Sequence, residues 1–150
     1  MGGTEDRHVA MGGTEDLHVA VLRGVYDRWR ASKGADTRAW LDVLAPSITF
    51  RSLGASTPAI GFSRNGVSAA EVERYFVDLA REWEMVDYVV EDMIAQGDRV
   101  AVLSHCTWRN RNTGKVTDSL KADFFRFADG RVVEFAELFD TAGAVEAAVP

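Results

Sequence analysis

The sequence contains a single cysteine, Cys106, among 150 residues, so it can form no internal disulfide and holds no Cys-x-x-Cys metal motif. A lone thiol suits a reducing compartment. No hydrophobic run approaches the roughly 18 residues that a membrane span needs, and the N-terminus lacks the apolar core of a secretory signal. The sequence therefore predicts a cytoplasmic protein without structural disulfides.

Basic residues are also scarce, with 17 Lys and Arg against 23 Asp and Glu, a net charge of −6 and a pI near 5.0. No basic stripe offers a binding surface for a nucleic-acid backbone or an anionic membrane, and no Gly-rich phosphate-binding loop occurs. With 47% hydrophobic residues, the chain has the composition of one globular domain. We expect a small neutral or cationic ligand rather than nucleic acid or membrane.

Residues 1–10 and 11–20 are near-identical copies that differ only at Arg7 and Leu17. A period of ten seen twice is too short for a solenoid repeat. We interpret residues 1–16 as a duplicated, flexible N-terminal segment without function, with Met1 and Met11 as alternative starts. Residues 17–150 then form a single domain.

Three segments carry apolar residues at helical spacing. The first helix is predicted to begin at Thr14 and to end at Gly34, and a short second one runs from Asp36 to about Pro46. A third is predicted over residues 68–83, because Ser68 and Glu71 form a capping box. Residues 141–149 suggest a last short helix.

Alternating patterns predict strands at 48–53, 86–95, 99–109, 117–127 and 131–139. Short turns join the last four into an antiparallel meander, and the Gly- and Ser-rich residues 54–66 read as a loop or lid. Helices and strands are segregated along the chain, which indicates an α+β fold with helices on one face of a curved sheet. Such a sheet wraps a cavity.

Three ionisable residues fall on strand faces that are otherwise apolar. Asp123 shares a face with Phe125, Glu137 shares one with Phe135, and His105 shares one with Leu103 and Thr107. If the three faces all point inward, His105, Asp123 and Glu137 converge on one pocket, where burial and an imidazole would support proton transfer without a metal or organic cofactor. The alternatives are surface carboxylates paired with Lys or Arg, and a histidine satisfied within the core.

Apolar and aromatic side chains would line this pocket and shape it for a hydrophobic substrate. The candidates for substrate binding are Trp29, Phe50, Tyr88, Leu103, Thr107, Phe125 and Phe135.

The segment from Ala122 to Asp140, with its Asp129-Gly130 hairpin and closing Phe139-Asp140, resembles the last two strands of SnoaL-like and ketosteroid-isomerase-like proteins. These belong to the nuclear-transport-factor-2-like (NTF2-like) superfamily, which has a cystatin-like fold. The resemblance spans about residues 17–148. It implies a cone-shaped α+β fold, in which a curved antiparallel sheet packs against about three helices and encloses a pocket, and it implies a homodimer.

The same resemblance implies roles for individual residues. Asp123 stands where ketosteroid isomerases hold a protonated aspartic acid, whereas their general base would fall near Ser52, where no acid stands. In SnoaL-like cyclases, Asp123 would be the acid–base residue with His105 on the neighbouring strand. The Asp–Arg–Asp set of limonene-epoxide-hydrolase-like proteins would fall at Thr107, His105 and Glu137, so only one acidic position is kept.

The resemblance thus leads us to expect a cofactor-independent cyclase or isomerase acting on a hydrophobic natural-product intermediate such as a polyketide, with His105, Asp123 and Glu137 as catalytic residues. The alternatives are an epoxide hydrolase or epoxide-opening cyclase, and a non-catalytic ligand-binding or dimerisation domain.

Overall fold

The computed structural model of the chain describes the backbone of residues 2–150 and the side chains of residues 13–150. Helix α1 (Gly2–Ala31) buries one stripe of apolar residues at helical spacing, namely Leu22, Val25, Tyr26 and Trp29. Gly34, with a φ of +80°, takes the left-handed conformation that turns the chain after the helix. The side chains of residues 1–12 lie outside the described part of the chain. The interpretation of residues 1–16 as a duplicated, flexible segment therefore stays a prediction.

Two further α-helices lie between α1 and the last four strands of the chain. Helix α2 (Arg38–Leu41) is shorter than predicted, because the chain pairs with strand β6 from Val43 and Leu44 onward instead of continuing the helix. Helix α3 (Ala69–Glu82) starts with the predicted capping box, in which the Ser68 hydroxyl accepts a hydrogen bond from the Glu71 N–H at 3.3 Å. Its buried residues are Val72, Tyr75, Phe76 and Leu79.

Six strands form one sheet in the order β2-β1-β6-β5-β4-β3. Their bounds are β1 (Leu44–Ser52), β2 (Gly66–Ser68), β3 (Trp83–Gln96), β4 (Arg99–Asn110), β5 (Val116–Ala128) and β6 (Arg131–Phe139). The predicted antiparallel meander of β3 to β6 is confirmed, whereas β1 runs parallel to β6. The short helix η1 (Pro58–Ile60) lies in the β1–β2 connection, and helix α4 (Thr141–Ala148) follows β6.

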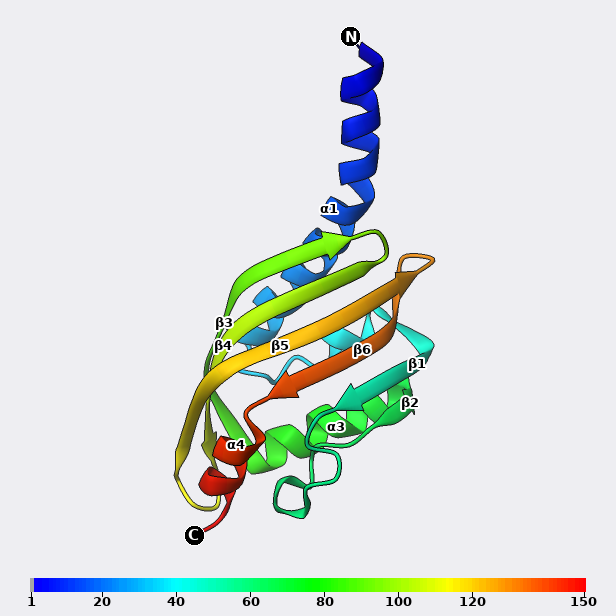
Figure 1. Cartoon of the computed structure of the whole chain (residues 1–150). Coiled ribbons are helices and arrows are strands. Elements are labelled where there is room, and N and C mark those ends of the chain that lie inside the picture. Colours follow the sequence, from blue (N-terminus) through cyan, green and yellow to red (C-terminus); the bar gives the residue numbers. More distant parts are fainter. Residues whose placement is uncertain (1) are drawn as a thin grey trace.

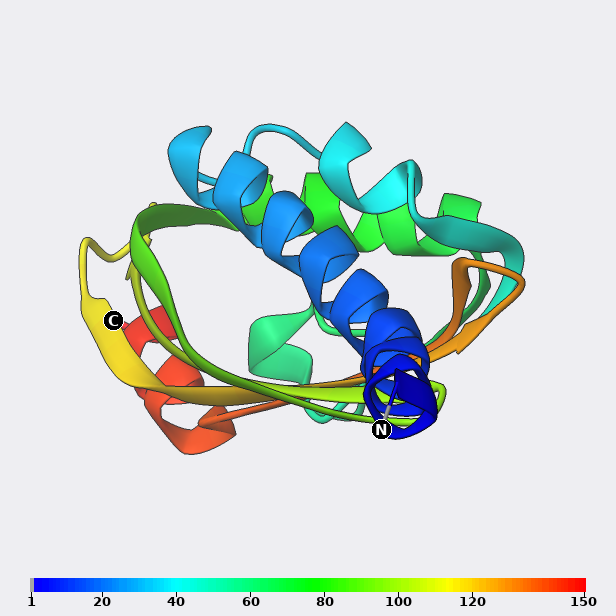
Figure 2. The same cartoon turned by 90° about the horizontal axis from the view of Figure 1, so that it is seen from above.

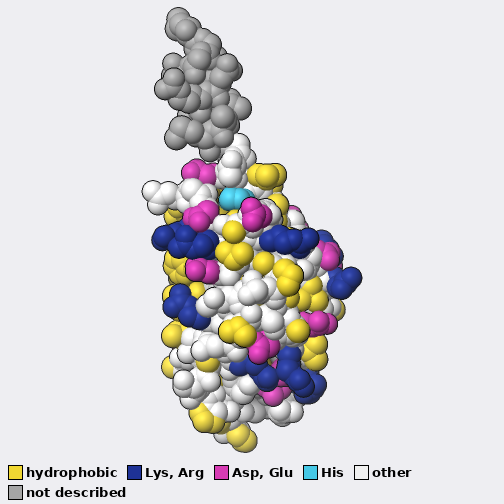
Figure 3. Space-filling model, turned by 90° about the vertical axis from the view of Figure 1, so that its right-hand side faces the viewer, with side chains coloured by type: hydrophobic (Ala, Val, Ile, Leu, Met, Phe, Trp, Pro, Cys, Tyr) yellow, Lys and Arg dark blue, Asp and Glu magenta, His cyan; other side chains and the backbone are white. Residues whose placement is uncertain are grey.

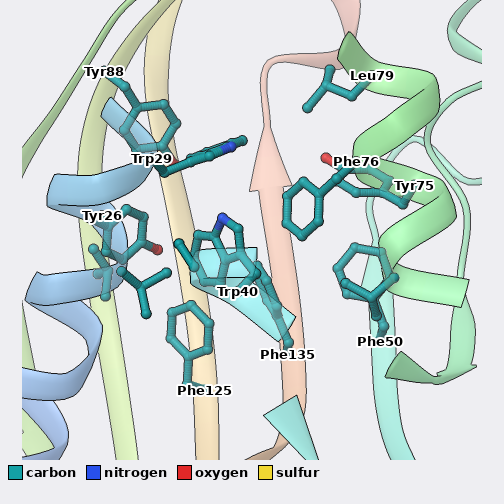
Figure 4. Packing of buried hydrophobic residues seen from close by; sticks show 14 of the residues in the cluster. Tyr26, Trp29, Trp40, Phe50, Tyr75, Phe76, Leu79, Tyr88, Phe125 and Phe135 are labelled. Atoms are coloured by element: carbon teal, nitrogen blue, oxygen red, sulfur yellow. The ribbon is translucent and has the colours of Figure 1, made fainter. Parts of the chain in front are cut away.

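The sheet curls without closing, and helices α1, α2 and α3 cover its concave side (Figures 1 and 2). The predicted α+β architecture is confirmed, with the parallel pair of β1 and β6 inside the sheet and β2 at its edge. Between sheet and helices lies an aromatic core in which Trp40 stacks against Phe76, Phe125 and Phe135 (Figure 4). Among the described residues, no helix has the length and hydropathy to cross a membrane.

The outside of the molecule mixes charges. Over the face shown in Figure 3, acidic and basic side chains lie beside one another rather than in patches of a single sign. Surface ion pairs such as Arg126 with Glu134, at 3.0 Å, are part of this pattern. The convex side of the sheet also exposes apolar residues, among them Ile94, Leu103, Leu120, Phe124 and Leu138.

Candidate functional site

The pairing of β5 with β6 brings two carboxylates together at the concave face of the sheet. Asp123 and Glu137 are direct cross-strand partners, and Lys121 lies two residues before Asp123 on the same face. The Lys121 ammonium is 3.0 Å from Asp123 Oδ1 and 3.0 Å from Glu137 Oε1. Both carboxylates are 1% exposed and Lys121 is 9% exposed. We call these three residues the ionic cluster.

Two tyrosines complete the surroundings of Asp123. The Tyr26 hydroxyl from α1 donates to Oδ2 at 2.5 Å, and the Tyr88 hydroxyl from β3 lies 3.3 Å from the same oxygen. Burial raises the pKa of Asp123, while the Lys121 charge and the hydrogen bond from Tyr26 act in the opposite direction without cancelling it. Burial and the Asp123 charge raise the pKa of Tyr26 and of Tyr88, so both hydroxyls keep their protons.

Lys121 is held as an ammonium ion. Burial alone would lower its pKa, but the negative charges around it, with Asp123 first, raise the pKa well above its ordinary value. Its three N–H bonds have three acceptors within reach, because the Tyr88 hydroxyl lies 3.3 Å away in addition to the two carboxylates. Lys121 is therefore a fixed, buried positive charge.

Each oxygen of Glu137 has its own polar partner. Lys121 lies at Oε1, and the Ser52 hydroxyl donates to Oε2 at 2.7 Å. Tyr75 from α3 also interacts with Glu137. Burial and the Glu137 charge raise the pKa of the Tyr75 hydroxyl. Each oxygen of Glu137 thus has a polar partner at a depth where an unpartnered carboxylate would be costly.

A cavity of about 50 Å³ opens beside the cluster. That is room for roughly three or four water-sized groups. Lys121 and Glu137 both border it, and Asp123 lies behind them. The lining residues are Trp29, Phe62, Tyr75, Leu79, Trp83, Tyr88, Cys106, Trp108, Thr117, Ser119, Lys121, Glu137, Phe139, Asp140 and Ala144. Figure 4 shows Trp29 and Tyr88 on one side, facing Tyr75 and Leu79 across the gap.

Residues 22–135, well over half of the chain, match the model of the SnoaL-like domain. The chain belongs to the SnoaL-like family. No curated protein sequence matches it.

Solved structures with the same fold cover nearly the whole SnoaL-like chain. An NTF2-like protein of unknown function from Burkholderia pseudomallei K96243 is 20% identical, with a TM-score of 0.77 over 89% of this chain and 98% of its own. A candidate SnoaL-like polyketide cyclase from Jannaschia sp. CCS1 is 17% identical, with a TM-score of 0.73 over 91% and 94%. TerC, co-crystallised with polyporic acid, is 16% identical, with a TM-score of 0.73 over 88% and 98%. At these identities, the likeness establishes the fold.

The prediction that His105 converges with Asp123 and Glu137 is wrong. In this SnoaL-like chain the even-numbered residues of β4 face inward, so His105 lies on the convex side. Its side chain is 43% exposed and pairs with Asp118. Leu103 and Thr107 share that outer face, and the Thr107 hydroxyl donates to Asp118 at 3.1 Å. These three residues do not border the cavity.

The other predicted residues lie inside the SnoaL-like domain. Trp29 and Tyr88 border the cavity as predicted. Phe50, Phe125 and Phe135 are buried in the adjoining aromatic core but do not border the cavity.

The central residue of the cluster, Lys121, was not predicted, although strand alternation places it on the face of Asp123. Ser52 stands at the position where a ketosteroid isomerase would have its general base, and it was given no role of its own. In the structure its hydroxyl donates directly to Glu137. In the part of the chain with described side chains, no group of three His, Cys, Asp or Glu residues is arranged to hold a metal ion.

Proposed function

We propose that the protein is a cofactor-independent acid–base enzyme of the SnoaL-like type, a cyclase or isomerase acting on a hydrophobic, oxygenated natural-product intermediate. The observation that carries this proposal is the position of Glu137 and Lys121, a carboxylate and an ammonium 3.0 Å apart that both border an aromatic cavity. A base and a fixed positive charge at one wall are the two groups that enolisation of a carbonyl compound requires.

In the proposed reaction, Glu137 takes a proton from the carbon next to a substrate carbonyl. The C–H electron pair forms the C=C bond of an enolate, and the carbonyl oxygen takes the negative charge. The Lys121 ammonium at the cavity stabilises that oxygen by its positive charge, and the Tyr88 hydroxyl, also at the cavity, can turn from Asp123 to donate to it. Attack of the enolate carbon on a second carbonyl closes a ring, and the alkoxide so formed takes the proton back from Glu137. In an unsaturated ketone the enolate extends over the C=C bond, and return of the proton to the γ-carbon gives an isomer.

Asp123 then acts through its neighbours rather than on the substrate. It lies behind Lys121 and Tyr88 and contacts both. With its carboxyl fixed by the Tyr26 hydroxyl at 2.5 Å, it holds the two cavity donors in place. We therefore assign proton transfer to Glu137 and a positioning role to Asp123.

The lining and the structural neighbours support the proposed substrate class. Seven aromatic residues border the cavity, namely Trp29, Phe62, Tyr75, Trp83, Tyr88, Trp108 and Phe139. One structural neighbour is a candidate polyketide cyclase and another was crystallised with polyporic acid. Because the cavity holds only about 50 Å³, a ring compound would place its reacting edge there and widen the cavity on entry.

The experiment follows proton exchange, so that the natural substrate need not be known. Enolisable cyclic ketones from cyclohexanone to 2-tetralone are incubated in D₂O, and loss of the α-proton signal is measured by NMR. The wild type is expected to accelerate exchange, and Glu137→Gln to lower the enzymatic rate by at least about a hundredfold. Glu134→Gln, three residues earlier on β6 and exposed, is the matched control and should keep the wild-type rate. Equal rates in Glu137→Gln and wild type would remove Glu137 from the reaction.

Epoxide hydrolysis is the second candidate, favoured by the pair of carboxylates joined through Lys121 and by room for a few waters. Glu137 would then activate a water that attacks an epoxide carbon, the C–O bond would break, and a donor at the cavity would protonate the oxygen. Cyclohexene oxide in H₂¹⁸O separates the two candidates, because hydrolysis yields a diol carrying one ¹⁸O. If neither exchange nor diol is detected, the reading as a ligand-binding or dimerisation domain is preferred.

We also propose that the protein is a homodimer joined through the convex face of the sheet. Apolar residues exposed there, such as Leu120 and Phe124, would be covered by a second copy. Light scattering after gel filtration should give twice the chain mass of 16.5 kDa. Leu120→Lys should lower the mass to that of one chain, and a dimer unaffected by this change would place the interface elsewhere.

A further inference from the structure

The connection between β1 and β2, residues 53–65, reaches the ionic cluster through a chain of hydroxyl groups. The Ser63 hydroxyl from this segment contacts the Ser52 hydroxyl, which donates to Glu137 Oε2 at 2.7 Å. All three residues are at least nine-tenths buried. The segment therefore touches Glu137 through Ser52, without bordering the carboxylate itself.

The direction of the hydrogen bonds is fixed by proton count. A serine hydroxyl has one proton, and an ionised carboxylate can only accept. Since Ser52 donates its one proton to Glu137, Ser63 must be the donor to Ser52. If Glu137 were protonated on Oε2, it would become the donor, and both hydroxyls would have to reverse. Ser63 and Ser52 thus form a chain of hydroxyl donors that ends on the Glu137 carboxylate.

The position of Ser63 is set by close packing at Gly54. A Cβ at position 54 would lie 2.6 Å from Ile60 Cδ1 and 2.8 Å from Ser63 Oγ, so a glycine is required for the segment to fold this closely. The main chain adds support, since the Ser52 N–H donates to Asn65 Oδ1 at 3.0 Å. The hydroxyl chain thus depends on the closed arrangement of residues 53–65.

The same segment forms part of the cavity wall. Phe62, next to Ser63, borders the cavity. Because Phe62 and Ser63 are adjacent in the chain, the segment that carries the hydroxyl chain also borders the cavity. Access to the cavity and support of the carboxylate share one element of structure.

We propose that Ser63 is a positioning residue for Glu137, and that it fixes the carboxylate through the Ser52 hydroxyl. The hydroxyl chain itself does not depend on the proposed function, but its effect on turnover does. The charged and titratable groups that face Glu137 are Lys121, Asp123, Tyr75, Tyr88 and Cys106.

The test is a pH titration of the Glu137 carboxyl carbon by ¹³C NMR in the full chain, which needs no substrate. Ser63→Ala should move the titration midpoint to higher pH by roughly half a unit, the size of one neutral hydrogen bond acting through an intervening hydroxyl. Gly54→Ala, which displaces Ser63 without altering the cluster, should move it in the same direction. Ser104→Ala is the matched control, because Ser104 is equally buried but its hydroxyl has no hydrogen-bond partner among the described residues.

A midpoint unchanged in both Ser63→Ala and Gly54→Ala would overturn the proposal. If Ser63→Ala does not fold, Gly54→Ala decides alone. In the exchange assay, the acidic limb of the rate profile should move with the midpoint. A shifted midpoint in a protein without exchange activity would leave the hydroxyl chain established and reject the proposed function instead.

Discussion

Replacement of Lys121 by methionine removes the positive charge between two buried carboxylates. Methionine has a similar length and fills the same space without charge. Asp123 and Glu137, both 1% exposed, are then left close together without the ammonium that lies 3.0 Å from each. Removal of one partner from a buried ion pair destabilises a protein by about 3–5 kcal/mol. For a chain of 150 residues this corresponds to a fall in Tm of roughly 10–15 °C at pH 7.

The loss should depend on pH. Burial already raises the pKa of Asp123, and removal of Lys121 takes away the charge that lowers it. In the folded variant Asp123 then holds a proton that the same residue has released in the unfolded chain, where an aspartate has a pKa of about 3.9. Because the folded state binds more protons, its stability rises as the pH falls. The deficit relative to wild type should therefore be smaller at pH 5 than at pH 7.

Thermal unfolding followed by circular dichroism at both pH values measures this effect. Lys115→Met is the matched control, since Lys115 is exposed on the same hairpin and bonds only main-chain carbonyls. The triple variant Lys121→Met, Asp123→Asn, Glu137→Gln, which has no buried charge left, should recover most of the lost stability. A Tm for Lys121→Met within 2 °C or so of wild type, or a triple variant as unstable as the single one, would refute the reasoning.

Two further predictions concern groups around the cluster. Tyr26→Phe removes the donor 2.5 Å from Asp123 and should lower the free energy of unfolding by about 1–3 kcal/mol in urea titrations, and a change under about 0.5 kcal/mol would contradict this role. Burial raises the pKa of the Cys106 thiol to about 11, so Ellman's reagent at pH 8 should label it only after unfolding. Labelling of the folded protein at the rate of a free thiol would show that the cavity is open to the reagent.

Most of the architecture could be predicted because its signals are local. The capping box at Ser68 and Glu71 marks the start of α3, and two-residue turns such as Asp129-Gly130 mark the hairpins of the meander. Alternation on β5 and β6 also placed Asp123 and Glu137 on inward faces correctly. Each of these features depends on residues within a few positions of one another.

The error at His105 has a physical cause. Both faces of β4 carry apolar residues, since Val100 and Val102 face the core while Ala101 and Leu103 lie on the convex side. Alternation defines two faces but not which one is buried. Because the convex face is also apolar, hydrophobicity did not distinguish the buried face of β4 from the exposed one. The histidine was therefore assigned to the wrong side.

Lys121 and Ser63 could not be recognised as site residues for different reasons. A lysine in a strand is usually solvent-exposed, and only its two carboxylate partners stabilise this one in the interior. Ser63 lies in a loop whose path is set by packing against Gly54 and Phe139, which no local pattern encodes. Tyr26 likewise meets Asp123 across 97 positions of sequence.

A crystal structure of Glu137→Gln with a bound ketone would test the central claim most directly, because the variant should bind the ligand without turning it over. The ketone used is the one whose exchange the wild type accelerates most. We predict that its carbonyl oxygen lies within hydrogen-bond distance of the Lys121 ammonium or the Tyr88 hydroxyl, with the α-carbon facing residue 137. A ketone bound on the convex face, or one with its carbonyl turned away from Lys121 and Tyr88, would contradict the account.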